Sequence, residues 1–165
     1  MLQAIALLPD AVRDRVFLRM FGLGPLEEDL RLRQRQLGLS GVTQIGGPIE
    51  AQDFSDYLSR TDFVVIPSRI DSIPLVFSDA LQGNTPVIAT PVGDLGEIIE
   101  KHKCGELARE ATADALAHAI QRAVTNGAAA YSKRIGEALQ MFDVDRSAKR
   151  WLACLTDPDR ADAKR

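Results

Sequence analysis

The stretch "DFVVIPSRIDSIPLVFSDALQGNTPVIATPVG", residues 62–93, decides the fold class. It holds two short apolar runs, Asp62–Pro67 and Pro86–Thr90, and neither alternates apolar with polar residues as a strand with one solvated face does. Between the two runs we expect a helix that starts near Pro74. Strands that are buried on both faces and joined by a helix predict a parallel sheet covered by helices on each side.

Strand and helix signals alternate in the same way on both sides of this stretch. Glycines and prolines mark the turns, and apolar residues at helical spacing mark the helices. The further predicted strands are Val16–Phe21, Val42–Ile45 and Gly105–Ala108. The further predicted helices begin at Pro25, cover Ala51–Arg60, carry Leu116, Ile120 and Val124, and fill most of the chain beyond Gly127. The sequence therefore predicts a Rossmann-like three-layer α/β/α domain with a parallel sheet.

A single domain is expected to span residues 1–155, since 165 residues suffice for one real core and no linker divides them. Residues 1–15 are predicted to be the end of a leading helix, and residues 143–155 a terminal helix. Within that terminal helix Trp151 is expected to pack against the sheet. The polar and charged residues 156–165 are predicted to form a flexible tail.

Composition excludes several classes of protein. The net charge of -3 provides no broad basic face, so we expect no nucleic acid partner. Only two cysteines are present, which suits a reducing compartment and predicts a cytoplasmic location. No apolar run approaches the roughly 18–20 residues that cross a bilayer, so no transmembrane segment is expected.

Two other motifs invite a functional interpretation and fail. The turn "GLGPLE" lacks the third small residue of a dinucleotide fingerprint, because Glu27 stands there, and the acidic helix start would repel a phosphate. His102, Cys104 and His118 do not make up a four-ligand metal site. We therefore expect no metal and no bound cofactor.

The opening stretch carries two carboxylates. Asp71 follows a predicted strand at the edge where open α/β sheets bind ligands, and Asp79 lies little more than one turn inside the next helix. The first turn of that helix carries no acid and is suited to an anion such as a diphosphate. Carboxylates on either side of such an anion would accept hydrogen bonds from hydroxyl groups. A ligand with hydroxyls on both sides of a diphosphate is a nucleotide sugar.

The same stretch resembles the donor-binding signature of the group 1 (family 4) retaining glycosyltransferases, which have the two-domain GT-B architecture. That signature runs strand, Pro-Ser, an acid, seven residues, a second acid, and a second strand followed by a glycine turn. The resemblance continues in "VFLRMFGLGP", "GEIIEKHKCGELA" and "FDVDRSAKRWLACL", and it covers nearly all of Val16–Leu155. It implies that the chain is the C-terminal, donor-binding half of such an enzyme.

The resemblance also implies roles for single residues. Asp71, with the backbone near Ile73 and Leu75, would bind the donor sugar, and Asp79 would bind the ribose hydroxyls. Gly46 and Gly47 would border the base, and Gly22 and Gly24 would line the cleft. Ser68 and Arg69 are placed to contact phosphate or sugar, with a turn serine and a surface arginine as the alternative. The catalytic group that works on the acceptor lies outside this chain and is unknown.

The sequence departs from the family pattern at four positions. Both family glutamates are aspartates here, each shorter by one bond of about 1.5 Å. The family glycine after the helix is Asn84, which tolerates the left-handed conformation, and a second glycine is replaced by Asp94. The family's basic pair and its whole acceptor domain would precede residue 1.

The expected function is therefore transfer of a sugar from a nucleotide-diphosphate donor, with retention of configuration, once the chain is joined to an N-terminal acceptor domain. Membrane-surface association is possible through that absent domain. Alone, the chain is expected to fold and to transfer no sugar. A degenerate, non-catalytic module that binds a nucleotide sugar or a protein is one alternative. Half of a nucleotide-sugar epimerase is another.

Overall fold

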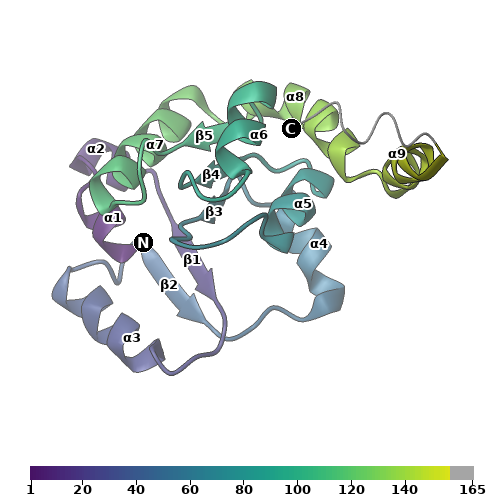
Figure 1. Ribbon diagram of the computed structural model, residues 1–165. Helices are drawn as coiled ribbons and strands as arrows, with labels where there is room; N and C mark the ends of the chain where they lie inside the picture. The colour runs from purple at the N-terminus through teal and green to yellow at the C-terminus, as the bar shows by residue number, and fades with distance from the viewer. Residues whose placement is uncertain (157–165) are drawn as a thin grey trace.

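The computed structural model describes residues 1–156, which form an α/β domain with five short strands (Figure 1). The strands are β1 (Leu18–Phe21), β2 (Thr43–Gly46), β3 (Val64–Ile66), β4 (Val87–Ala89) and β5 (Gly105–Leu107). The helices that connect them are α3 (Glu27–Gln36), α4 (Ala51–Ser59), α5 (Leu75–Gln82) and α6 (Leu95–His102). Helices α1 (Leu2–Ala6) and α2 (Asp10–Arg13) precede β1, and α7 (Ala113–Asn126), α8 (Ala129–Leu139), the 3-10 turn η1 (Gln140–Phe142) and α9 (Val144–Thr156) follow β5.

All strand pairs are parallel, as the apolar runs predicted. They form two sheets within the described residues: β1 pairs with β2, and β3, β4 and β5 pair in that order. The sequence pattern predicts parallel strands because it reports burial on both faces, but it contains no signal for which strands pair. The α/β class and the parallel direction of the strands are confirmed.

The two faces of β4 explain why its sequence is wholly apolar. Ile88 belongs to a core cluster that includes α1 and α7, whereas Val87 and Ala89 belong to a second cluster built with α5, α6 and α8. Successive side chains of a strand point to opposite faces, so every residue of β4 enters one core or the other. In Figure 1, α1 and α7 lie on one side of the strands and α4 and α5 on the other.

The local signals at helix ends are largely where the sequence predicted them. Gly38 follows α3 with φ +66°, and Asn84 follows α5 with φ +54°, so Asn84 adopts the predicted left-handed conformation. The start of α3 was predicted wrongly. It begins at Glu27 rather than at Pro25, because Pro25 and Leu26 form a turn before the first helical residue.

The prediction that Trp151 packs against the sheet is wrong. Its side chain is 66% exposed, and α9 projects away from the strands beyond α8 (Figure 1). Helix α8 packs into the core instead, with Ile135 and Ala138 buried in the second core cluster. Of the predicted tail, residues 157–165 lie outside the described residues.

Candidate functional site

The loop between β3 and α5 carries Ser68, Arg69 and Asp71 at the carboxyl end of its strand. Asp71 is exposed, and one of its carboxylate oxygens, Oδ1, accepts a hydrogen bond of 2.9 Å from the backbone N–H of Ser72. That bond fixes the carboxylate beside the backbone and leaves its other oxygen open to a ligand. Arg69 lies beside the start of α1: burial, and then the Arg69 guanidinium, lower the pKa of the Met1 amino group.

The start of α5 presents free backbone donors and no negative charge. Pro74 precedes the helix and has no N–H, while the N–H of Phe77 donates to the Pro74 carbonyl at 2.9 Å. The amides of Leu75 and Val76 are left without an acceptor in the described chain, and the first turn holds no acid. These donors, at the positive end of the helix dipole, are suited to an anion.

Asp79 lies one turn further along α5, on the same face as Leu75. Residues four apart on a helix are neighbours on its surface, and helical side chains lean toward the N-terminus. Asp79 is half-buried and has no ion pair or side-chain hydrogen bond among the described residues, whereas Leu75 is 83% exposed. Its carboxylate therefore has no partner among the described residues and lies on the same face of the helix as Leu75. Ile73 is half-buried and packs against the second core cluster.

A second loop supports the first. The N–H of Asp94, in the loop after β4, donates to the Ser72 carbonyl at 3.3 Å. Gly93 has φ +51°, and a Cβ built there would lie 2.2 Å from the Ser72 carbonyl oxygen and 2.6 Å from that of Asp71. Only a glycine allows this approach of the two backbones. The sequence predicted a glycine turn at Gly93, but it contained no signal that this glycine packs against the Asp71 loop.

The four glycines predicted to border the base and line the cleft lie at the ends of β1 and β2, with Gly46 as the last residue of β2. Phe21 and Gly46 are partners in the strand register, and a Cβ on Gly46 would meet the Phe21 ring at 3.6 Å. Gly22, Gly24 and Gly47 are exposed around this contact. The structure thus brings the glycine loops together, but no hydrogen bond among the described residues joins them to the Asp71 loop, which lies apart from the loop after β1 in Figure 1.

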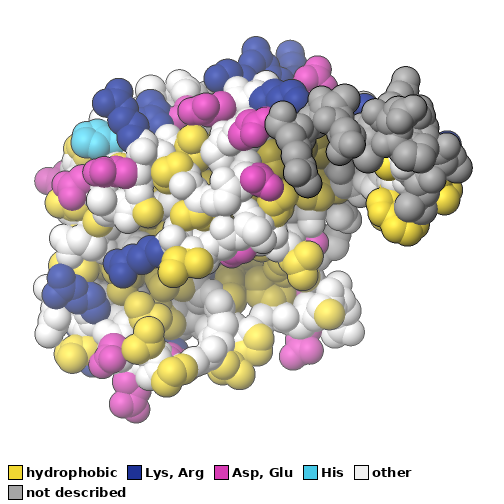
Figure 2. Space-filling model, viewed as in Figure 1, with side chains coloured by type: hydrophobic (Ala, Val, Ile, Leu, Met, Phe, Trp, Pro, Cys, Tyr) yellow, Lys and Arg dark blue, Asp and Glu magenta, His cyan; other side chains and the backbone are white. Residues whose placement is uncertain are grey.

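This strand-end face is rich in apolar side chains. Leu23 and Leu26, in the turn before α3, are 78% and 62% exposed, and Ile70 of the Asp71 loop is 95% exposed. Figure 2 shows hydrophobic side chains around the loop that follows β1, with the basic side chains gathered mainly along the opposite, upper edge. The predicted site is therefore an open wall with an apolar rim, not an enclosed cavity.

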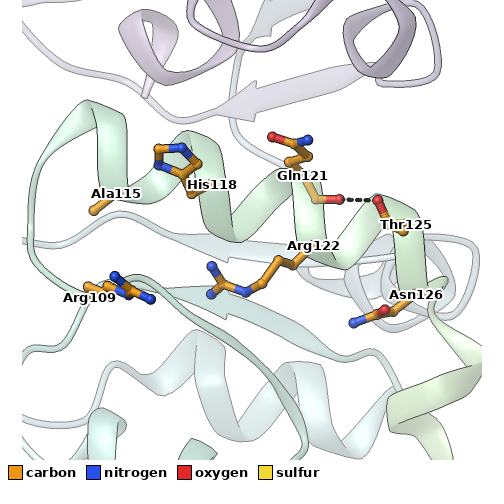
Figure 3. Close-up of a pocket in the computed structure, with 7 residues that line it drawn as sticks. All are labelled: Arg109, Ala115, His118, Gln121, Arg122, Thr125 and Asn126. Atoms are coloured by element: carbon orange, nitrogen blue, oxygen red, sulfur yellow. Dashed lines mark hydrogen bonds between the residues drawn. The ribbon is translucent and has the colours of Figure 1, made fainter.

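A hollow of about 550 Å³ lies elsewhere, on the surface of α7 (Figure 3). Arg109 and Arg122 line it with their guanidinium groups turned toward one another, beside His118. Arg122 already donates to Glu106 at 2.7 Å and to the Leu107 carbonyl at 2.8 Å. None of the predicted site residues lines this hollow. The Arg122 guanidinium is already hydrogen-bonded to β5 and so links α7 to that strand.

Other chemistry has little support among the described residues. No three His, Cys, Asp or Glu side chains in residues 1–156 come together as a metal site. Burial raises the pKa of the Cys104 thiol to about 11, which makes this cysteine unreactive at neutral pH. No helix in the described part of the chain is long and apolar enough to span a bilayer.

Comparison with solved structures identifies the fold. The fold matches the crystal structure of HepE of Anabaena in complex with UDP, with a TM-score of 0.76 and 22% identity over 94% of this chain and 43% of that one. HepE and the other similar structures are GT-B glycosyltransferases. At this identity the likeness concerns the fold alone, and it fits the C-terminal domain of that architecture.

Sequence comparison then gives the family. A family model for glycosyl transferases group 1 matches residues 1–140, and the chain belongs to this family. An exopolysaccharide phosphotransferase of Streptomyces coelicolor is 30% identical over 144 residues, which are 85% of this chain and 15% of that protein. A D-inositol 3-phosphate glycosyltransferase of Xylanimonas cellulosilytica is 30% identical over 99 residues, 60% of this chain and 24% of that protein. The chain therefore spans about a quarter or less of these curated relatives.

Proposed function

We propose that this chain binds the nucleotide-diphosphate sugar used by a retaining, family 4 glycosyltransferase and forms the donor-binding half of that enzyme. One observation carries the proposal: Asp71 and Asp79 lie on either side of the acid-free start of α5, where the Leu75 and Val76 amides lack acceptors. Backbone N–H groups that can bind an anion, flanked by two carboxylates with no ion pair among the described residues, match a diphosphate flanked by two sets of hydroxyls.

Each group has a distinct role in this proposal. The diphosphate lies at the Leu75 and Val76 amides, Asp79 accepts from the ribose hydroxyls, and Asp71 accepts from the donor sugar. Hydrogen bonds to charged groups contribute about 1.5–3 kcal/mol each, so the two carboxylates supply much of the selectivity. Ser68 and Arg69 border the sugar and phosphate, the backbone at Ile73 lies beside the sugar, and the glycine loops border the base and the cleft.

The transfer itself needs groups beyond this chain. The bond from the anomeric carbon to the diphosphate oxygen breaks, and its electron pair leaves with the diphosphate. An acceptor oxygen forms the new bond on the same face and loses its proton. The α5 amides stabilise the charge on the leaving diphosphate without a metal. An N-terminal acceptor domain supplies the second wall of the cleft and any contact with a membrane surface, in the cytoplasm. The basic pair that binds the phosphates lies in a loop between that domain and the first helix of this one.

A non-catalytic nucleotide-sugar-binding module is the second candidate. It is favoured by the two aspartates, whose side chains are each shorter by about 1.5 Å than those of glutamates. Shorter side chains at both positions would weaken the hydrogen bonds to the donor sugar and the ribose that a transferase needs. The two candidates share the same binding site, so a binding experiment tests what is common to them.

Binding of UDP and UDP-glucose tests the site, since HepE is described in complex with both. The chain should bind UDP near millimolar affinity, about 4 kcal/mol of binding free energy, because the basic phosphate partners are absent. Asp79→Ala should weaken both ligands by about 1–3 kcal/mol, and Asp71→Ala should weaken only UDP-glucose. Asp114→Ala, an exposed aspartate at the start of α7, is the control and should change neither. Equal behaviour of all three variants would refute the assignment.

A further inference from the structure

Thr90 makes a buried hydrogen bond to the Asp71 loop, although Thr90 is not one of the proposed binding residues. It follows β4, and its side chain is only 3% exposed. Its hydroxyl oxygen lies 2.5 Å from the Ser68 carbonyl oxygen and 3.3 Å from that of Ile66. A hydroxyl has a single proton to donate, and the nearer Ser68 carbonyl is the better acceptor. The hydroxyl therefore connects the end of β4 to the loop that carries Asp71.

The backbone of Thr90 already continues the pairing with β3, because its N–H donates to the Ile66 carbonyl at 3.2 Å. The side-chain bond extends this link by two residues, beyond the strand and into the loop. The loop is then held at Ser68 by the Thr90 hydroxyl and at Ser72 by the Asp94 N–H. These two points bracket the segment that contains Asp71.

Apart from the bond between the Ser72 N–H and the Asp71 carboxylate and the packing of Gly93 on the loop backbone, the bracketed segment has little else to fix it. Arg69, Ile70 and Asp71 are all exposed, and the Ile70 side chain is 95% exposed. Exposed side chains bury little apolar area and hold a backbone weakly. The position of the Asp71 carboxylate thus depends on the two anchored carbonyls on either side of it.

We propose that Thr90 is a positioning residue of the donor site, whose buried hydroxyl holds the Ser68 carbonyl and so sets where Asp71 meets the donor sugar. The proposal rests on the proposed function. A carboxylate that shifts by about 1 Å loses hydrogen-bond geometry with the sugar hydroxyls, although it contacts the same solvent and keeps its charge. Thr90 never touches the ligand in this account.

Thr85 provides a matched control on the same strand. It precedes β4, is 2% exposed, and its hydroxyl donates to the Leu58 carbonyl at 2.8 Å. Thr90→Val and Thr85→Val each remove one buried hydroxyl of the same kind and keep the side-chain shape. They differ in which end of β4 loses its bond. Thr90→Ser keeps the hydroxyl and should restore the behaviour of the unsubstituted chain.

The first measurement needs no ligand. Backbone order parameters from 15N relaxation of residues 69–72 should fall in Thr90→Val from about 0.85, typical of a rigid backbone, toward about 0.6, because the hydrogen bond to the Ser68 carbonyl no longer holds the loop. The same order parameters should be unchanged in Thr85→Val and in Thr90→Ser. Unchanged order parameters in Thr90→Val would overturn the inference whatever the chain binds.

The second measurement is the preference for UDP-glucose over UDP. Thr90→Val should lower this preference by about tenfold, Thr85→Val should leave it within about twofold, and the double variant Asp71→Ala/Thr90→Val should lose no more than Asp71→Ala alone. If the unsubstituted chain binds UDP-glucose and the two valine variants show the same preference for UDP-glucose over UDP, the role of Thr90 is overturned and the proposed function is not. No binding in the unsubstituted chain would overturn the proposed function and the role of Thr90 in it.

Discussion

Replacement of Gly93 by alanine is the perturbation whose cost the structure defines best. Gly93 has φ +51°, so an alanine pays about 1–2 kcal/mol for the left-handed conformation. Its methyl group would also lie 2.2 Å from the Ser72 carbonyl oxygen, whereas ordinary C···O contacts are about 3.3–3.6 Å. The Asp71 loop must therefore retreat by about 1 Å. Overpacking of this kind costs about 1–3 kcal/mol, which makes the expected total about 2–5 kcal/mol.

Urea unfolding measures this cost, and Gly38→Ala is the control. Gly38 has φ +66°, and nothing lies within 4 Å of a Cβ built there. Its alanine variant should therefore lose only about 1–2 kcal/mol of folding free energy, from the left-handed conformation alone. The difference between the two free energies of unfolding isolates the contact with Ser72. If Gly93→Ala costs no more than Gly38→Ala, the two loops do not approach each other as described, and Gly93 does not support the Asp71 loop.

Four further predictions concern other parts of the chain. Asn84→Gly should be neutral or slightly stabilising in thermal melts, whereas Asn84→Val should cost about 1–2 kcal/mol, because only valine is strained at φ +54°; equal stability of the two would refute this. Burial and the hydrogen bond to Glu106 raise the pKa of Tyr131 to about 12. The stability that this neutral phenol confers is present below its ordinary pKa of about 10 and should be lost, by about 2–3 kcal/mol, as the pH rises to 12. Unfolding of Tyr131→Phe across that range should show a smaller loss, and an identical pH profile would contradict the account. A thiol reagent at neutral pH should label the exposed Cys154 quickly and the buried Cys104 only on unfolding, and equal rates would contradict the described burial. The 165-residue chain alone should transfer no sugar in a radiolabel assay, because a two-walled cleft contributes as much as about 7–11 kcal/mol to lowering such barriers, and measurable transfer would contradict the proposed half-enzyme.

The sequence predicted those parts of the fold that depend on burial and local conformation. The apolar run of β4 predicted a strand buried on both faces, and the structure divides Val87, Ile88 and Ala89 between two cores. Asn84 and Gly38 ended their helices as predicted because a left-handed residue is a local requirement. Such features need no knowledge of distant parts of the chain.

Features that depend on distant partners were not predictable in the same way. The spacing of Trp151 predicts one apolar helix face, but no residue near it specifies what covers that face. Thr90 at the end of an apolar strand is typical of a core-filling residue, and its bond to Ser68 became visible only once β3 and β4 were placed side by side. For the site, the order of Asp71, the helix start and Asp79 was predictable, while the packing of Gly93 on the Asp71 loop was not.

Backbone amide shifts during a UDP titration test the central claim most directly, because they report where the ligand binds. The account predicts the largest shifts at Leu75 and Val76, with smaller ones from Ser68 to Ser72 and at Asp79. The basic hollow on α7 offers a clear alternative location for a diphosphate. If the largest shifts instead lie at Arg109, Arg122 and the rest of that hollow, with α5 unaffected, the start of α5 is not the nucleotide site.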